Sequence, residues 1–349
     1  MFRCAYRYSG ARLTKSIAGL RVSDRSIQAL WYVGAGRAEL RPESVAAPAP
    51  AQVRVRALFG AISRGTERLV FNGAVPPSQY QRMRGPHMAG AFPYPAKYGY
   101  ATVGRVEQGP VELQDLIVFA LHPHQSVFTV AADSVAPVPK QVPPARAVLA
   151  ANMETALNGV WDGAPGPADR IAVVGGGVVG LLVARLCARM PGTQVTVVDI
   201  AASRGAIAQA LGAGFAAPAA APEGCDVVFH ASGTAAGLAT ALRIAGEEAT
   251  IVELSWYGAG DVAVPLGEAF HSRRLRLVSS QVGLLAPSHR LRWSRARRLA
   301  AALDLLADPT LDGLLAPAVP FENLPARLAE ILGPQTDARC PLIRYPDPE

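Results

Sequence analysis

The second half of the chain alternates between short apolar runs and longer stretches with helical spacing. Strands are expected near residues 171–174, 195–198, 226–230, 249–254 and 275–279. Helices are expected between several of them, as at 203–211 and 235–244. This alternation is typical of an α/β fold with a doubly wound parallel sheet.

The first half has a different pattern. Between about residues 28 and 140, short strand-like runs such as 53–57, 116–120 and 127–130 are separated by Gly and Pro turns. The pattern then predicts helices at 145–161, 289–307 and 324–332, and an extended segment at 341–345. The chain is therefore expected to hold a β-rich unit, then an α/β unit, then a closing segment after Pro287.

The expected strand at 171–174 runs directly into a glycine-rich turn. Gly175, Gly177 and Gly180 have the GxGxxG spacing, and a helical stretch follows at 181–190. The first glycine allows a tight turn, the second lets the backbone approach a pyrophosphate, and the third lets helix and strand pack closely. Free N–H groups and the helix dipole favour an anion at the helix start.

The next expected strand ends in Asp199, which lies 19 residues after Gly180. A carboxylate there accepts hydrogen bonds from a ribose 2′-OH and repels a 2′-phosphate, so the cofactor expected is NAD rather than NADP. A glycine-rich turn without a ligand is the alternative. The residues expected to bind the cofactor are Gly175, Gly177, Val178, Val179, Gly180, Asp199, Arg204 and Ser232.

Composition narrows the class of protein. The 349 residues are 50% hydrophobic, enough for about two buried cores. No apolar run reaches the ~18–20 residues that span a bilayer, and residues 1–25 lack the apolar core of a signal peptide. The four cysteines form no CxxC pair, which argues against a disulfide framework. A cytoplasmic protein with no membrane partner is expected.

The net charge of +7 comes mostly from residues 1–25, which carry +5. This segment is interpreted as a disordered extension or an overlong start site, with a transit-like segment as the alternative. A second basic cluster is interpreted as a solvated helix face, with no nucleic-acid partner expected. It comprises Arg290, Arg292, Arg295, Arg297 and Arg298.

From about Gln28 onward the chain resembles the medium-chain dehydrogenase/reductase superfamily. The resemblance rests on residues 62–67 (ISRGTE), 97–106 (KYGYATVGRV), the glycine turn and 255–258 (SWYG). It is closest to zinc-type alcohol dehydrogenases, and among them to bacteriochlorophyllide-dehydrogenase-like members. It implies a GroES-like β-barrel catalytic domain at 26–150, which is completed by 288–349, and a Rossmann NAD-binding domain at 151–287. It also implies that the substrate binds between the two domains, and that the protein forms a dimer as is common in the family.

Zinc-type members have a Cys-Gly-Thr/Ser-Asp motif and a Gly-His-Glu motif. By this resemblance the cysteine position falls on Arg64, the histidine position on Tyr100 and the third ligand position on Glu154. Arginine and tyrosine do not normally bind zinc, and Arg64 places a positive charge where the cation would sit. No catalytic zinc is therefore expected at the family position.

Four residues at these positions are the catalytic candidates: Arg64, Thr66, Tyr100 and Glu154. Thr66 matches the family's proton-relaying hydroxyl, or it stabilises the turn beside Gly65. Tyr100 donates to a substrate oxygen, as Arg64 would, or it fills the space of the lost metal site. Glu154 forms a buried ion pair with Arg64, or it is a general base with a shifted pKa.

Two histidines leave a second metal hypothesis open. His122 and His124 lie two residues apart in a strand or turn, within reach of Glu154 or Glu67 in some arrangements. They either form a displaced metal site or are surface or polar-pocket residues, and the second interpretation is preferred.

The resemblance implies an NAD(H)-dependent oxidoreductase that interconverts a secondary alcohol and a ketone, with a small-molecule substrate. One alternative is a zinc-free enoyl or quinone reductase, which usually prefers NADPH and is therefore disfavoured by Asp199. The other is a catalytically silent NAD-binding protein, which Thr66 and the intact glycine turn weakly disfavour. The sequence does not identify the substrate.

Overall fold

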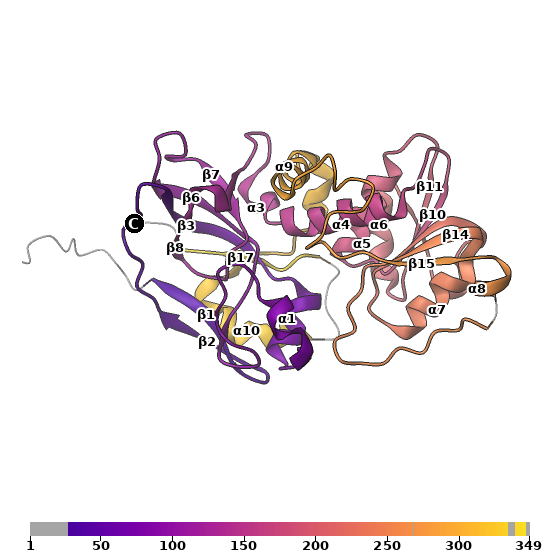
Figure 1. Ribbon diagram of the computed structural model, residues 1–349, viewed down its shortest axis with the longest axis horizontal. Helices are drawn as coiled ribbons and strands as arrows, with labels where there is room; N and C mark the ends of the chain where they lie inside the picture. Colours follow the sequence, from indigo (N-terminus) through magenta and orange to yellow (C-terminus); the bar gives the residue numbers. More distant parts are fainter. Residues whose placement is uncertain (1–26, 268, 334–338, 347–349) are drawn as a thin grey trace, which may run out of the picture.

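The computed structural model describes residues 27–267, 269–333 and 339–346, so the basic segment 1–25 lies outside the described residues. Within the described ranges the strands form a six-stranded, a seven-stranded and a four-stranded sheet. Figure 1 shows an elongated molecule with the parallel sheet at one end and the β-rich part at the other.

The six-stranded sheet is parallel throughout. In spatial order its strands are β12 (Gly214–Ala216), β11 (Gln194–Val198), β10 (Arg170–Val174), β13 (Cys225–His230), β14 (Ala245–Glu253) and β15 (Arg276–Ser279). After β10 the chain adds β11 and β12 on one side of this strand. It then returns to add β13, β14 and β15 on the other side, which makes the sheet doubly wound. The α/β class predicted by the sequence is confirmed.

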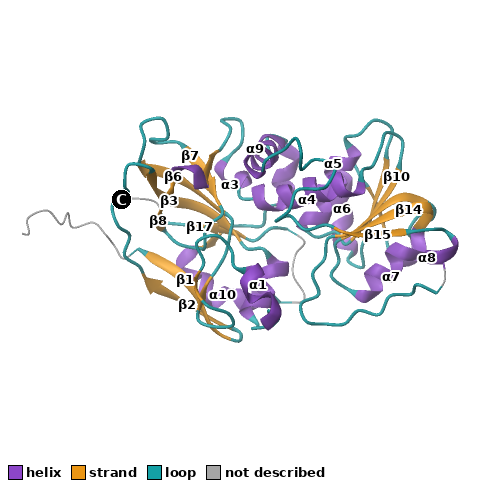
Figure 2. Ribbon diagram, viewed as in Figure 1, coloured by secondary structure: helices purple, strands orange, loops and turns teal. Residues whose placement is uncertain are grey.

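Alternating side chains of these strands enter two different cores, because successive residues point to opposite faces of a sheet. Ile171 and Val173 pack with α4 (Ala150–Gly163) and α5 (Val178–Ala188). Ala172 and Val174 pack with α7 (Ala235–Ile244). The core on the α4 face includes residues of α6 (Gly205–Ala210), and Phe270 of α8 (Ala269–Ser272) borders the other core. Helices therefore cover both faces of the sheet (Figure 2).

The β-rich part contains the other two sheets. The seven-stranded sheet consists of β16 (Val319–Pro320), β17 (Leu342–Arg344), β3 (Gln52–Ala61), β6 (Thr102–Gln108), β7 (Ile117–Ala120) and β9 (Val135–Pro137), with β8 (Val127–Ala131) also paired to β3. The four-stranded sheet has the order β2 (Arg37–Pro42), β1 (Gln28–Gly34), β5 (Ala96–Lys97) and β4 (Ala89–Gly90). The last strand of the chain, β17, thus pairs with the early strand β3.

Short helices pack around these sheets. They are α1 (Arg64–Phe71), α2 (Tyr80–Met83), α3 (Pro144–Ala147), α9 (Arg295–Leu305) and α10 (Leu324–Ile331). Val70 and Phe71 of α1 and Leu324 and Leu328 of α10 belong to one buried cluster with Leu30 of β1. Residues of α9 join the core that contains α4 and α5.

Several helix boundaries differ from the sequence prediction. The helix expected at 145–161 is divided into α3 and α4, with Val148 and Leu149 between them. The helix expected at 289–307 begins only at Arg295, because the Ser294 hydroxyl accepts the Arg297 N–H and caps it. The short strand β12 was not predicted, since Gly214–Ala216 has no apolar run of strand length. The domain boundaries drawn at 150 and 287 remain a prediction.

Two further expectations concern membranes and disulfides. Among the described residues, no helix has both the length and the apolar character to cross a bilayer. Cys187, Cys225 and Cys340 are buried free thiols, while Cys4 lies outside the described residues.

Candidate active site

The glycine turn between β10 and α5 has a geometry that larger residues would disrupt. Gly175 has φ +109°, and a Cβ there would lie 2.6 Å from the Ser232 backbone nitrogen. A Cβ on Gly180 would lie 2.0 Å from the Gly175 carbonyl oxygen. By contrast, a Cβ on Gly177 would meet no atom within 4 Å. Backbone packing thus requires glycine at positions 175 and 180, whereas Gly177 faces open space.

Gly177 is also the N-cap of α5 and has no side-chain capping bond. The first N–H groups of this helix, including those of Val178 and Val179, have no acceptor within the helix. They lie at the carboxyl edge of the parallel sheet, where ligands bind in doubly wound folds. An open, uncapped helix start is the arrangement that a pyrophosphate fits.

Asp199 is tied to this turn. Its side chain is only 5% exposed, and its Oδ2 accepts the Gly176 N–H at 2.7 Å. Its Oδ1 accepts the Ala201 N–H at 2.8 Å, and Arg204 forms an ion pair with Oδ2. The carboxylate therefore holds the glycine turn while an arginine partly neutralises it. Asp199 and Arg204 were both expected at the cofactor, whereas their ion pair with each other was not predicted.

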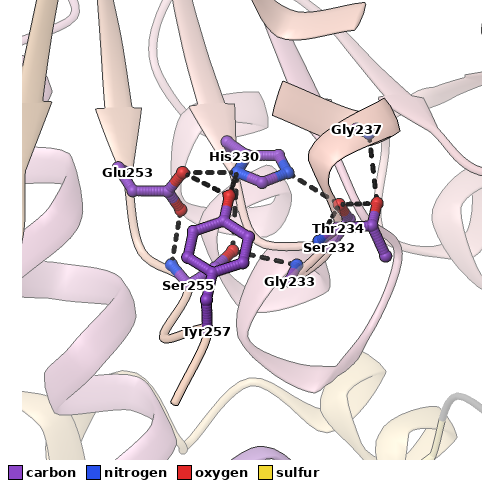
Figure 3. Close-up of polar contacts among 8 residues, drawn as sticks. All are labelled: His230, Ser232, Gly233, Thr234, Gly237, Glu253, Ser255 and Tyr257. Carbon is purple, nitrogen blue, oxygen red and sulfur yellow. Dashed lines mark hydrogen bonds and ion pairs between the residues drawn. The ribbon is translucent and has the colours of Figure 1, made fainter. Parts of the chain in front are cut away.

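A polar relay lies at the ends of β13 and β14 (Figure 3). His230 is fully buried, with Nδ1 2.7 Å from Glu253 Oε2 and Nε2 2.6 Å from Ser232 Oγ. The Tyr257 hydroxyl donates to Glu253 Oε2 at 2.9 Å, and the Ser255 N–H donates to Glu253 Oε1 at 2.7 Å. Burial alone would raise the pKa of Glu253, but the hydrogen bond and charge of His230 and the donors Ser255 and Tyr257 outweigh it and lower that pKa.

Ser232 was expected among the cofactor-binding residues, whereas no role was predicted for His230 or Glu253. A signal was present, because both residues lie at the carboxyl ends of expected strands. Parallel strands bring these ends to one edge of the sheet. The pairing of β13 with β14 then sets His230 directly opposite Glu253.

Three of the four catalytic candidates lie near the start of α1. The Tyr100 phenol is within hydrogen-bonding reach of the Ser63 and Thr66 hydroxyls. Burial raises the pKa of Tyr100 to about 12, so the phenol is protonated at neutral pH. Burial also raises the pKa of the Cys340 thiol to about 12, with Arg64 close enough to oppose that increase. Arg64, Thr66 and Tyr100 are thus brought together around one part of the β-rich unit.

Glu67, the next residue on α1, is completely buried in its own network. Its carboxylate accepts the Tyr32 hydroxyl at 2.6 Å, contacts His124 Nε2 at 2.9 Å and accepts the Ser63 N–H at 2.8 Å. His122, the other histidine of the expected pair, stacks on Phe128, with the two ring centroids 3.8 Å apart. Burial lowers the pKa of His122 to about 3, so this ring is neutral.

Glu154, the fourth candidate, has a different partner from the one expected. Its Oε1 lies 3.1 Å from Arg298 Nε of α9, and both side chains are at most 7% exposed. Arg298 also donates to Asn158 Oδ1 at 2.8 Å and to the Val282 carbonyl at 2.6 Å. Burial raises the pKa of Glu154 despite the opposing charge of Arg298. A buried ion pair does form, but it joins α4 to α9 rather than to Arg64.

Several of these side chains are the metal ligands that the sequence resemblance called into question. Within the described residues, no group of three or more His, Cys, Asp or Glu side chains is arranged to hold a metal ion. His124 is committed to Glu67, and Glu154 is committed to Arg298. Both side chains are therefore already engaged by other side chains.

No protein-family model matches the chain, and no curated protein matches its sequence. Solved structures match its fold. L-idonate 5-dehydrogenase from Escherichia coli K-12 has a TM-score of 0.74 at 14% identity, covering 92% of this chain and 98% of that one. Alcohol dehydrogenase TADH from Thermus sp. ATN1 has a TM-score of 0.70 at 20% identity, covering 91% and 100%.

A third structure, described as a zinc-binding dehydrogenase from Sinorhizobium meliloti 1021 bound to NADP, has a TM-score of 0.72 at 19% identity. It covers 92% of this chain and 99% of that one. Likeness at such identities shows the fold alone. The chain has the fold of the medium-chain dehydrogenases, with a GroES-like β-barrel and a Rossmann sheet, as the sequence predicted.

Proposed function

We propose that the protein is an oxidoreductase that uses a nicotinamide dinucleotide to interconvert a secondary alcohol and a ketone. The observation that carries this proposal is the open, uncapped turn at Gly177, held by Asp199 at the carboxyl edge of the parallel sheet. A pyrophosphate fits the free N–H groups of α5, and an adenosine ribose fits beside Asp199. Similar folds solved with NADP and with NADH support the same class of cofactor.

The residues near α1 supply the chemistry that the protein itself would contribute. A bound nicotinamide supplies or accepts the hydride. Tyr100 is protonated at neutral pH and can donate to the oxygen of a ketone. Thr66, within hydrogen-bonding reach of that phenol, both donates and accepts, so it can pass the proton onward. Arg64 adds a positive charge in the same area, which favours an oxygen that gains negative charge.

The same residues also suit reduction of an activated double bond, so a zinc-free enoyl or quinone reductase is the second candidate. Turnover separates the possibilities: NAD⁺ with a panel of secondary alcohols tests the first, and NADH with enones and quinones tests the second. Cofactor binding without turnover in either panel would favour a silent NAD-binding protein. The substrate is proposed to be a small molecule, and a homodimer is proposed from the resemblance.

Cofactor preference is the first prediction. NADH is expected to bind about tenfold more tightly than NADPH, because a 2′-phosphate would lie beside the Asp199 carboxylate. Asp199→Ala should reverse the preference, since it releases Arg204 to pair with the phosphate. Arg204→Ala should instead disfavour NADPH further, which makes it the matched control. Isothermal titration of each variant with both cofactors gives the answer, and an unchanged preference in Asp199→Ala would contradict the assignment.

Metal content is the second prediction. Purified protein is expected to contain no stoichiometric zinc, and chelator treatment should change neither its melting temperature nor its turnover. The reason is that Glu154 and His124 are engaged by Arg298 and Glu67, while Arg64 and Tyr100 stand where zinc ligands would be. Elemental analysis settles the point. One zinc per chain whose removal abolishes turnover would disprove it.

A further inference from the structure

The relay at the ends of β13 and β14 occupies a definite place relative to the proposed cofactor. In the sheet, β11 lies on one side of β10, and β13 followed by β14 lies on the other. The turn after β10 suits the pyrophosphate, and Asp199 after β11 suits the adenosine ribose. The other half of a dinucleotide must therefore extend over the ends of β13 and β14, where the relay lies.

Hydrogen-bond directions in the relay are set by its acceptors. Glu253 accepts from Tyr257 and from the Ser255 N–H, so its carboxylate is best satisfied when His230 Nδ1 donates to it. In the tautomer with its proton on Nδ1, the ring accepts the Ser232 hydroxyl proton at Nε2, 2.6 Å away. The Thr234 N–H donates to Ser232 Oγ at 3.3 Å. The direction of the hydrogen bond at Glu253 thus sets the direction of the hydrogen bond between His230 and Ser232.

The relay adds side-chain hydrogen bonds between two loops that follow paired strands. One loop follows β13, and its Gly233 N–H donates to Ser255 Oγ of the loop after β14 at 3.0 Å. Figure 3 shows His230 between the two loops, with Ser232 on one side and Glu253 and Tyr257 on the other. His230 is the residue that contacts both, because its two ring nitrogens bond to opposite loops.

Each loop also touches one part of the proposed site. The backbone of Ser232 packs against Gly175, whose Cβ position lies 2.6 Å from the Ser232 nitrogen. In the other loop, the Cβ position of Gly258 lies 3.3 Å from Leu69, which belongs to the helix that carries Thr66. The relay therefore stands between the glycine turn and α1.

Ser232, His230 and Glu253 have the order of a nucleophile, a base and an orienting acid. The surroundings of Ser232 Oγ oppose that role. A Cβ on Gly237 would lie 2.0 Å from this oxygen, so the first turn of α7 covers it. The oxygen is also bonded to His230, to the Thr234 N–H and to the Thr234 hydroxyl. An oxygen that has three hydrogen-bond partners and lies under the first turn of α7 serves to fix a loop rather than to attack an acyl group.

We propose that His230 is a positioning residue that fixes these two loops as the seat of the nicotinamide nucleoside and sets it in register with Thr66 and Tyr100. The proposal rests on the proposed function, because it presumes that a nicotinamide dinucleotide binds at the glycine turn. His230 and Glu253 then act on the nicotinamide half of the cofactor and not on the adenosine half. Loss of the relay therefore weakens the hold on the nicotinamide nucleoside and leaves the adenosine half in place.

The test compares NADH with ADP-ribose, which keeps both phosphates and the adenosine half but lacks nicotinamide. In His230→Asn the dissociation constant for NADH should rise about tenfold, the effect of one or two lost hydrogen bonds, while that for ADP-ribose should stay within about twofold. Glu253→Gln keeps the side-chain shape and should show the same split. Thr250→Val, a buried change three residues earlier on β14, is the control and should alter neither constant.

Each result has a distinct meaning. Equal losses for NADH and ADP-ribose would show that the relay only supports the fold, and no loss would show that the cofactor does not need it; either overturns the proposal. Equal affinity of the wild-type protein for the two ligands would also overturn it, while leaving dinucleotide binding intact. Wild-type protein that binds neither ligand would overturn the proposed function itself. If His230→Asn does not fold, Glu253→Gln carries the comparison.

Discussion

Replacing Tyr100 by Phe is expected to lower turnover by about 10²–10³-fold, the loss seen when one donor to a developing oxyanion is removed. The residue is half-buried and its phenol is protonated at neutral pH, and the phenol is within hydrogen-bonding reach of Thr66. The change removes one hydroxyl and little volume, so the dissociation constant for NADH should not move. Thr66→Ala should lower turnover in the same way. Steady-state kinetics on the best substrate of the alcohol and enone panels measures both.

Tyr98 provides the matched control. It is 3% exposed and lies edge-on to Tyr100, but its hydroxyl donates to the Met83 carbonyl at 3.3 Å. Tyr98→Phe should therefore retain most of the turnover. If Tyr100→Phe behaves like Tyr98→Phe, the Tyr100 phenol only fills space, and the assignment of the electrophile fails.

Replacing Glu154 by Ala is expected to lower the free energy of unfolding by about 3–5 kcal/mol, because it leaves Arg298 charged and buried without its partner. Two other acceptors of Arg298, Asn158 Oδ1 and the Val282 carbonyl, remain but are neutral. Urea unfolding followed by circular dichroism measures the change. The midpoint should fall with little change in the m-value.

The exposed pair of Arg327 and Glu330 serves as the control for this experiment. Its side chains are 48% and 69% exposed, so Glu330→Ala should leave the unfolding midpoint nearly unchanged. A stable Glu154→Ala variant that has lost turnover would contradict the structural role. It would restore the general-base interpretation of Glu154.

The features that sequence predicted well are local ones. The spacing of Gly175, Gly177 and Gly180 lies within one turn and the start of a helix, so it can be recognised from a few neighbouring residues. Five of the six strands of the parallel sheet, all but β12, were predicted because apolar runs of strand length are bounded by turns. Asp199 was found by its distance from that turn along the chain.

The features that sequence missed depend on residues far apart in the chain. Arg298 lies 144 residues after Glu154, and no periodicity links α9 to α4. His230 and Glu253 face each other only because β13 and β14 pair in one particular register. The break between α3 and α4 was also missed. Val148 and Leu149, which lie at this break, are fully buried in the core that contains α4 and α5. These pairs of residues come together only in the tertiary structure, and no pattern in the local sequence predicts them.

The pairing of β17 with β3 also bears on the order in which the chain folds during synthesis. All strands of the parallel sheet lie between residues 170 and 279, so that sheet can form while the residues after 279 are still being translated. Strand β3, made much earlier, lacks the neighbour at one edge until residues 342–344 leave the ribosome. The β-rich part is therefore begun before the parallel sheet and completed after it, and until then the free edge of β3 is open to pairing with other chains.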